Sequence, residues 1–258
     1  MNTDKKYFIL DMGVLLTRSL KHMMRSIDTV ITVCITPIAI MLMFVYVFGG
    51  SLGGGMSTAD YVVFSLPGIL LISIASAIAY TAIRLFSDMK SGLFDRFKAM
   101  PISASAVLWA HVLTSLVSNA ITLTIIFVVA MLMGFRSYAS IYHWLAIIGI
   151  LVLFTLALTW VAVIAGLKAK SEEGASAFSY PLVFLPFISS AFLPTDNMPE
   201  IIKVFAEHQP ITAIVECIRL LFANDAVNQN IWIALAWCLG ILIIAYLIAM
   251  HVYRKNIN

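Results

Sequence analysis

One motif in the chain matches a known pattern for a catalytic nucleophile. Residues 49–53 read Gly-Gly-Ser-Leu-Gly, the nucleophile-elbow pattern G-x-S-x-G around Ser51. That pattern exposes its serine only on a sharp turn between a strand and a helix. Here a long apolar run precedes the motif and more glycines follow it, as in a loop after a membrane span. We therefore expect no catalytic role for Ser51.

Other catalytic and ligand-binding patterns are absent from the sequence. It contains no G-x-x-x-x-G-K-[ST] phosphate loop and no H-E-x-x-H zinc pair. The five histidines are scattered, and the three cysteines, which we expect to be small buried hydrophobic residues, lie far apart: His22, His111, His143, His208, His251, Cys34, Cys217 and Cys238. We predict that this chain is not an enzyme and holds no metal or cofactor.

Mildly polar side chains at helical spacing are the remaining candidates for binding. Thr114, Ser118 and Thr122 follow one another at four-residue steps, beside Asn119, and a second group includes Ser179 and Tyr180. Such residues either hydrogen-bond neighbouring membrane helices or form a wall that faces a substrate. Both interpretations stay open. The six residues are our candidates for a translocation cavity.

The composition indicates a membrane protein. Of 258 residues, 62% are hydrophobic and 11% are charged, and the mean hydropathy is +0.99. A soluble domain has roughly 45–50% apolar and about 25% charged residues. These values exclude a soluble enzyme, a nucleic-acid-binding protein and a disordered chain. The net charge of +3 is too small to indicate a polyanionic partner.

Six apolar stretches are long enough to cross a bilayer, which takes about 20 residues. They are residues 30–48, 61–83, 103–134, 144–167, 174–192 and 231–252. The sequence thus predicts one all-α polytopic membrane domain over residues 1–258. No charged residue lies in the middle of any of these stretches. Because ion-coupled carriers usually place a charge there, we expect the energy for transport to come from another polypeptide.

The positive charges orient the predicted spans. Thirteen lie on one side, namely Lys5, Lys6, Arg18, Lys21, Arg25, Arg84, Lys90, Arg96, Lys98, Lys168, Lys170, Arg254 and Lys255. Only Arg136, Lys203 and Arg219 fall on the other side. The positive-inside rule therefore predicts that both termini face the cytoplasm. Residues 4–27 are basic and amphipathic, and we predict a helix at the membrane surface or, alternatively, one packed on the bundle.

The predicted cytoplasmic loop 87–101 combines apolar and charged side chains. Leu93, Phe94 and Phe97 alternate with Asp95, Arg96 and Lys98. Aromatic anchors beside charges are typical of a docking surface. The alternative is a plain connector whose phenylalanines enter the membrane interface.

The predicted outer segment, residues 193–225, contains two short helices separated by a break at residues 208–210. A stripe in the second helix comprises Ile211, Ile214, Val215, Ile218, Leu221 and Phe222. Glu216 and Arg219 are spaced to form an ion pair. We expect this double helix to re-enter the outer leaflet and gate the cavity through Ile211, Glu216 and Arg219. A flat cap on the lipid headgroups is the alternative.

Two segments resemble a known family. One is Gly92, Arg96, Met100, Pro101, Ile102 and Ser103, and the other is the stretch from Pro186 to Phe222. Together they resemble the membrane subunit of ABC-2 type exporters, a group that includes daunorubicin-resistance, polysaccharide and teichoic-acid export permeases. In one departure, Ala191 follows Ser189-Ser190 where many members have Ser-Gly.

The resemblance implies a transporter of two membrane subunits, expected to be a homodimer, and two ATP-binding subunits that bind ATP and Mg. It implies that Leu93, Phe94, Asp95, Arg96, Phe97 and Lys98 dock the ATP-binding subunit. Membrane lipid is a further expected partner, in a bacterial plasma membrane, and nucleic acid is not. The predicted function is export of an amphipathic or lipid-linked substrate. An ion-coupled or passive carrier is the alternative, ahead of a membrane-embedded lipid-modifying enzyme.

Overall fold

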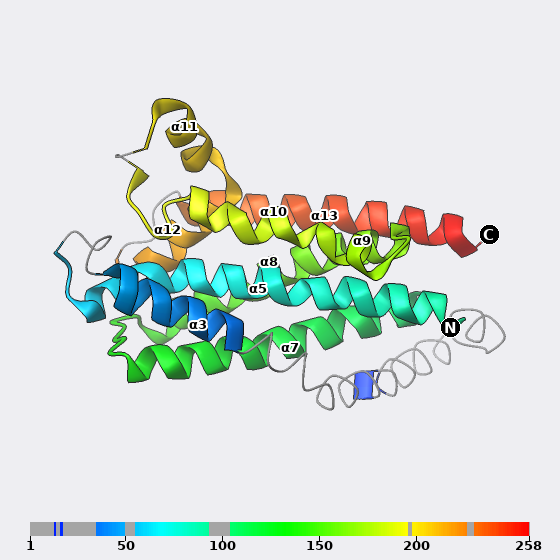
Figure 1. Ribbon diagram of the computed structural model, residues 1–258, viewed down its shortest axis with the longest axis horizontal. Helices are drawn as coiled ribbons and strands as arrows, with labels where there is room; N and C mark the ends of the chain where they lie inside the picture. The colour runs from blue at the N-terminus through cyan, green and yellow to red at the C-terminus, as the bar shows by residue number, and fades with distance from the viewer. Residues whose placement is uncertain are drawn as a thin grey trace.

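The computed structural model describes residues 13, 16–17, 35–49, 55–92, 104–195, 198–225 and 230–257. Every regular element among them is helical (Figure 1). They are α3 (Thr36–Leu42), η2 (Met43–Phe48), α5 (Thr58–Lys90), α7 (Ala104–Leu132), α8 (Ile141–Lys168), α9 (Glu172–Ala177), α10 (Ser179–Phe184), η3 (Leu185–Ile188), α11 (Glu200–His208), α12 (Pro210–Ala223) and α13 (Asn230–Ile257).

Four helices are long and apolar enough to cross a membrane. They are α5, α7, α8 and α13, and each contains one of the predicted spans 61–83, 103–134, 144–167 and 231–252 almost entirely. At about 1.5 Å per residue, the 33 residues of α5 extend well beyond a hydrocarbon core of about 30 Å. Ser57 begins α5 by accepting a hydrogen bond from the Asp60 amide, and Ser140 caps α8 in the same way through His143.

The other two predicted spans are not single long helices in the described residues. For the stretch 30–48, the described part is the shorter apolar helix Thr36–Phe48. The stretch 174–192 is divided among α9, α10, η3 and the turn that follows. Pro181 and Pro186 lack the amide hydrogen that an α-helix needs, and their rings crowd the preceding turn. Our prediction of six continuous spans is therefore only partly confirmed.

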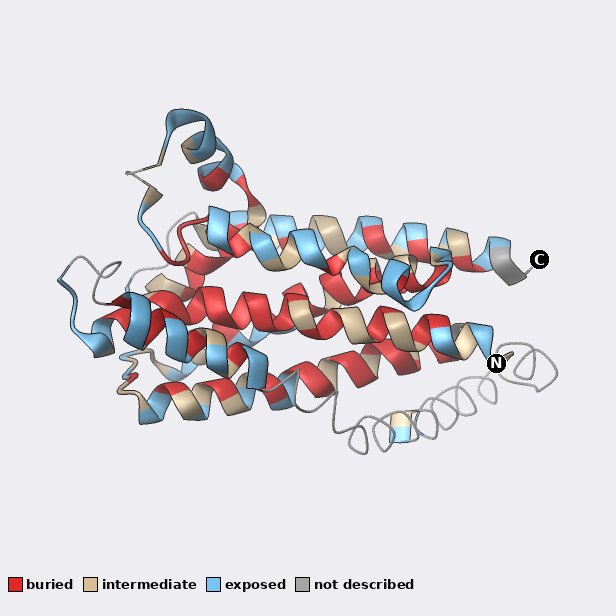
Figure 2. Cartoon of the chain, viewed as in Figure 1, coloured by how far each residue is buried: buried red, intermediate tan, exposed pale blue. Residues whose placement is uncertain are grey.

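Helices α5 and α8 pack against each other, α7 contacts both of them, and α13 packs on α8. Within one copy, 78% of the apolar 18-residue stretch of α5 is buried, but only 22% of the corresponding stretch of α13. Helix α5 is therefore central and α13 peripheral (Figure 2). Gly166 lets α5 and α8 approach closely, because a Cβ there would lie 2.8 Å from the Ala82 carbonyl oxygen. Aromatic rings of Trp109, Trp160 and Tyr246 join α7, α8 and the middle of α13.

Candidate functional site

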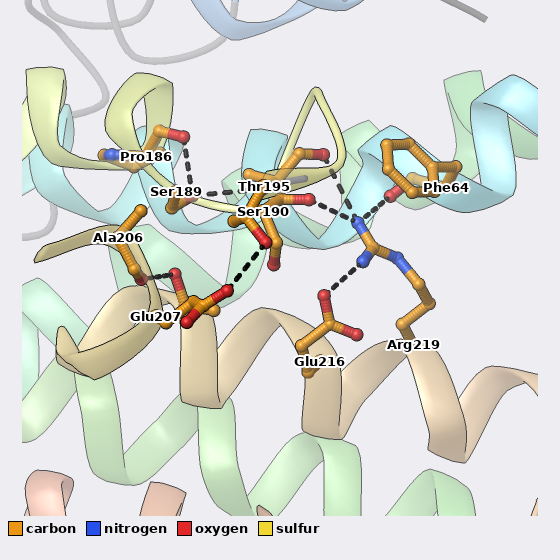
Figure 3. A network of polar contacts seen from close by, with 11 residues as sticks. Phe64, Pro186, Ser189, Ser190, Thr195, Ala206, Glu207, Glu216 and Arg219 are labelled. Atoms are coloured by element: carbon orange, nitrogen blue, oxygen red, sulfur yellow. Dashed lines mark hydrogen bonds and ion pairs between the residues drawn. The ribbon is translucent and has the colours of Figure 1, made fainter. Parts of the chain in front are cut away.

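Arg219 of α12 is the most connected polar side chain at the end of the bundle that carries α11 and α12 (Figure 3). Its Nη1 donates to Glu216 Oε1 at 2.7 Å, so the ion pair predicted from the i,i+3 spacing is confirmed. Its Nη2 donates to the carbonyl oxygens of Phe64 and Ser190 at 2.9 and 3.0 Å. The guanidinium also lies 3.9 Å from the centre of the Phe64 ring. A single side chain thus satisfies acceptors from three separate segments.

These contacts tie α12 to α5 and to the turn after η3. The turn itself approaches α5 closely, because a Cβ on Gly68 would lie only 2.6 Å from the Ala191 Cβ. Ser189 closes the turn by donating to the Pro186 carbonyl oxygen at 2.6 Å. The sequence showed the charge pair but not these partners, since Phe64 lies 155 residues before Arg219.

The apolar stripe of α12 is buried inside the chain itself. Its six members, Ile211, Ile214, Val215, Ile218, Leu221 and Phe222, are at most 4% exposed. They pack in the core formed with α5, α8 and α13. The stripe therefore finds its apolar environment in neighbouring helices, and insertion into lipid is not needed to explain it. Ile211, one of the three proposed gate residues, is part of this core.

Helix α11 differs from α12 in burial. Ile201, Val204 and Phe205 are each more than half exposed. The helix begins at Glu200, directly after Pro199. The predicted break between the two helices is present, because Gln209 is extended and Pro210 begins α12.

Most of the polar candidates on α7 are satisfied by their own helix. Thr114 donates to the Ala110 carbonyl oxygen at 2.7 Å, and Thr122 donates to that of Ser118 at 3.1 Å. The link across to α8 is made by Ser115, whose hydroxyl lies 3.0 Å from that of Thr159. Thr159 was not among the predicted residues. Within this group the hydrogen bonds are thus made inside α7, and the contact to α8 comes from the neighbouring Ser115.

Asn119 differs from the other five candidates because it lines a pocket of about 390 Å³ between α7 and α8. The pocket walls are mainly apolar, and Phe127, Met131, Trp144 and Ile148 are among them. On α10, Ser179 donates to the Ser176 carbonyl oxygen at 2.7 Å, and Tyr180 is 62% exposed. Neither residue of α10 lines this pocket, so the structure does not bring the six candidates together.

Comparison with known proteins identifies the family. The model of the ABC-2 type transporter family matches residues 11–223, which is most of the chain. The chain belongs to the ABC-2 type transporter family. This confirms the resemblance that the two sequence segments indicated.

Several curated proteins resemble this ABC-2 chain over most of its length. A daunorubicin resistance ABC transporter permease of Streptomyces coeruleorubidus is 26% identical over 230 residues, covering 88% of this chain and 80% of the relative. A probable doxorubicin resistance ABC transporter permease of Mycobacterium tuberculosis (strain CDC 1551 / Oshkosh) is 22% identical over 241 residues, 92% of this chain and 86% of the relative. ABC transporter G family member 20 of Dictyostelium discoideum is 25% identical over 216 residues, 79% of this chain and 29% of the relative.

Family membership makes this ABC-2 chain a transport subunit, and ATP hydrolysis belongs to a separate subunit. Among the described residues, no three His, Cys, Asp or Glu side chains are grouped to hold a metal ion. Cys217 and Cys238 are free and fully buried, as expected of small hydrophobic residues, whereas Cys34 lies outside the described residues.

The predicted docking loop of this ABC-2 chain is only partly described. Residues 87–90 continue α5, and Leu93, Phe94, Asp95, Arg96, Phe97 and Lys98 lie outside the described residues. The predicted surface helix 4–27 also lies outside them, apart from residues 13, 16 and 17. Close to the loop, Asp88 Oδ2 lies 3.3 Å from Nε2 of the buried His111, which links α5 to α7. Sequence patterns gave no signal for this contact.

Proposed function

We propose that this permease exports an amphipathic or lipid-linked substrate from the cytoplasm or the inner leaflet. The observation that carries the proposal is the match, over most of its length, to permeases whose names record daunorubicin or doxorubicin resistance. The spans agree with such a substrate, because their exposed faces are largely apolar and most of the polar groups buried between them are uncharged hydroxyls.

The ATP-binding subunit docks on the segment between α5 and α7. Leu93, Phe94 and Phe97 supply apolar anchors, and Asp95, Arg96 and Lys98 set the register around them. The contact between Asp88 and His111 supports this role, because it joins the two helices that flank the segment. A movement of the docked ATP-binding subunit would therefore be transmitted to α5 and α7 together.

A second copy of the chain completes the translocation path. The exposed apolar faces of α8 and α13 support a homodimer, since Ile141, Leu145, Ile243, Ile244 and Leu247 are all more than half exposed in one copy. Lipid covers the apolar surface that the second copy does not bury. Thr114, Ser118, Asn119, Thr122, Ser179 and Tyr180 remain candidates for contact with substrate, and Asn119 has the best support because it lines a pocket.

Residues 193–225 close the outer end of this path. In this proposal α12 is the fixed part of the gate, since Arg219 fastens it to α5 and Ile211 is buried in the core. Glu216 holds the guanidinium in place. The protein lies in a bacterial plasma membrane with both termini in the cytoplasm, which agrees with thirteen of its sixteen Lys and Arg residues lying on one predicted side.

The test is daunorubicin efflux from cells that express this chain with a co-expressed ATP-binding subunit, with a hydrolysis-deficient form of that subunit, or alone. We expect efflux only with the active subunit. Efflux by the chain alone that stops when the proton gradient is dissipated would indicate an ion-coupled carrier instead. Impermeant thiol labelling of single cysteines at Ser51 and Lys90 tests the topology, and labelling at position 90 in intact cells would contradict it.

A further inference from the structure

The pocket between α7 and α8 contains one unpaired polar atom in a mainly apolar surround. Asn119 is 2% exposed, and its Oδ1 accepts no hydrogen bond from any residue that the structure describes. A buried acceptor without a partner costs about 1–3 kcal/mol, so such atoms are rare in native proteins. An unmet acceptor at the wall of a pocket indicates a site for a hydrogen-bond donor.

The orientation of the Asn119 amide follows from its neighbours. Its Nδ2 donates to the Ser115 carbonyl oxygen at 2.9 Å. The flipped amide would set Oδ1 against that carbonyl oxygen, and two acceptors repel each other. The oxygen is therefore the unpaired atom, and the missing partner is a donor.

The two threonine hydroxyls at the pocket differ from Asn119 Oδ1, because each already makes a hydrogen bond within its own helix. The hydroxyl of Thr124 donates to the Ala120 carbonyl oxygen at 2.7 Å, and that of Thr155 donates to the Leu151 carbonyl oxygen at 2.7 Å. At one end Phe127 and Trp144 stand edge to face with their ring centres 5.6 Å apart. The pocket thus combines aromatic and aliphatic walls with one buried acceptor that makes no hydrogen bond to the described residues.

We propose that this pocket binds a small amphipathic molecule with an aromatic body and one N–H or O–H donor, which is held by Asn119 Oδ1. Its volume of about 390 Å³ lies at the lower end of the range of about 300–1,000 Å³ for ligand pockets. A lipid acyl chain would fill the space but leave the acceptor unpaired. The inference deepens the proposed export function by naming the class of substrate that this site selects.

The test is a binding titration on the full chain in lipid nanodiscs, without the ATP-binding subunit. The probe is N-phenyl-1-naphthylamine, an aromatic amine with one N–H, and its N-methyl derivative is the donor-free comparison. Energy transfer from tryptophan to the probe reports binding, and empty nanodiscs correct for probe in the lipid. We expect saturable binding of the amine, and binding of the N-methyl derivative that is about 5–10-fold weaker.

Two pairs of variants distinguish the effect of the Asn119 acceptor on binding from the effect of the pocket volume. Asn119→Leu keeps a similar side-chain volume and should weaken binding of the amine about 5–10-fold, while binding of the N-methyl derivative changes less than about two-fold. Thr124→Val also removes a polar group from the pocket wall, but one that already donates within α7, so it should change both affinities equally and by less than about two-fold. Ala120→Trp fills the pocket and should abolish both, whereas Val128→Trp, on an exposed α7 position outside the lining, should leave both intact.

Each other outcome overturns the proposal. Equal affinity for both probes, in the native chain and in Asn119→Leu, would show a plain apolar slot for an acyl chain. Absence of saturable binding, or efficient cross-linking of Ile148→Cys between two copies, would show that no ligand occupies the pocket. An Asn119→Leu chain that melts below the native one would indicate a purely structural role. ATP-dependent efflux without probe binding would refute this site alone, whereas binding without such efflux would refute the export function alone.

Discussion

The two short helices α11 and α12 are neighbours in sequence, and both carry an apolar stripe, yet their surroundings are opposite. Ile214 and Ile218 of α12 are fully buried, whereas Ile201 of α11 is 87% exposed. Arg219 of α12 reaches two other segments, α5 and the turn after η3, whereas Lys203 of α11 has an ion-pair contact of 3.8 Å with Glu207 of its own helix. An amphipathic pattern thus predicts that a helix has an apolar face, but not what covers that face.

Attachment of the two helices explains the difference. Helix α12 lies against α5, α8 and α13, and its only charged pair is anchored to backbone oxygens of α5 and of the turn after η3. Helix α11 contacts α12 through its C-terminal end, where Ala206 is buried and its carbonyl oxygen accepts from Thr212. In Figure 1, α11 stands out from the side of the bundle at the end that α12 closes. We therefore expect mutations in α12 to affect stability far more than those in α11.

The largest difference should come from the charged residues. Arg219→Met leaves Glu216 and several carbonyl oxygens without their partner in a partly buried place, which should cost about 3–5 kcal/mol of unfolding free energy. Lys203→Met on α11 is the matched control, and loss of an exposed pair should cost about 0.5 kcal/mol or less. Thermal unfolding in detergent measures both. Similar melting temperatures for the two variants would contradict the anchoring role of Arg219.

Truncation of the apolar stripes should give the next largest difference. Ile218→Ala removes a fully buried side chain and should lower the free energy of unfolding by about 2–4 kcal/mol. Ile201→Ala removes an exposed one and should change it by less than about 0.5 kcal/mol. The same unfolding assay compares them. A marked loss of stability in Ile201→Ala would show that the face of α11 is covered in the assembled protein, by lipid or by a second copy.

The sequence predicted features that have a local pattern, but it did not predict contacts between distant segments. Hydropathy located α5, α7, α8 and α13 because each meets the length and apolarity that a span requires, and i,i+3 spacing located the pair of Glu216 and Arg219. Contacts between distant segments, such as that of Arg219 with Phe64, leave no local pattern. Pro181 and Pro186 accompany the division of residues 174–192, but α5 runs unbroken through Pro67, so a proline alone does not predict such a division. The pocket beside Asn119 depends on packing that no sequence spacing specifies.

The stability of the protein should also be sensitive to mutation where the turn after η3 approaches α5. Gly68→Ala places a methyl group 2.6 Å from the Ala191 Cβ, so the turn must shift, at a cost of about 1–3 kcal/mol. Gly240→Ala in α13 meets nothing within 4 Å and should instead stabilise its helix by up to about 1 kcal/mol. Opposite shifts in melting temperature are therefore expected. A neutral Gly68→Ala would show that the turn moves freely against α5, and with it the anchor of α12.

Among the α12 variants, Glu216→Gln should change stability least, and its effect is the most specific to function. The amide still accepts from Arg219, and the guanidinium keeps its bonds to Phe64 and Ser190, so we expect a loss of only about 1 kcal/mol. The efflux rate should fall markedly although the loss of stability is small, because under the proposed function the guanidinium loses its counter-charge at the outer gate. The double variant Glu216→Gln with Arg219→Gln removes both charges, so it should regain part of the export while remaining less stable, since the bonds to α5 are gone. Efflux and unfolding measured on the two single variants and the double variant form a cycle that separates charge balance from anchoring. Wild-type efflux by Glu216→Gln at normal expression would mean that Arg219 works only as an anchor, and that α12 differs from α11 in attachment alone.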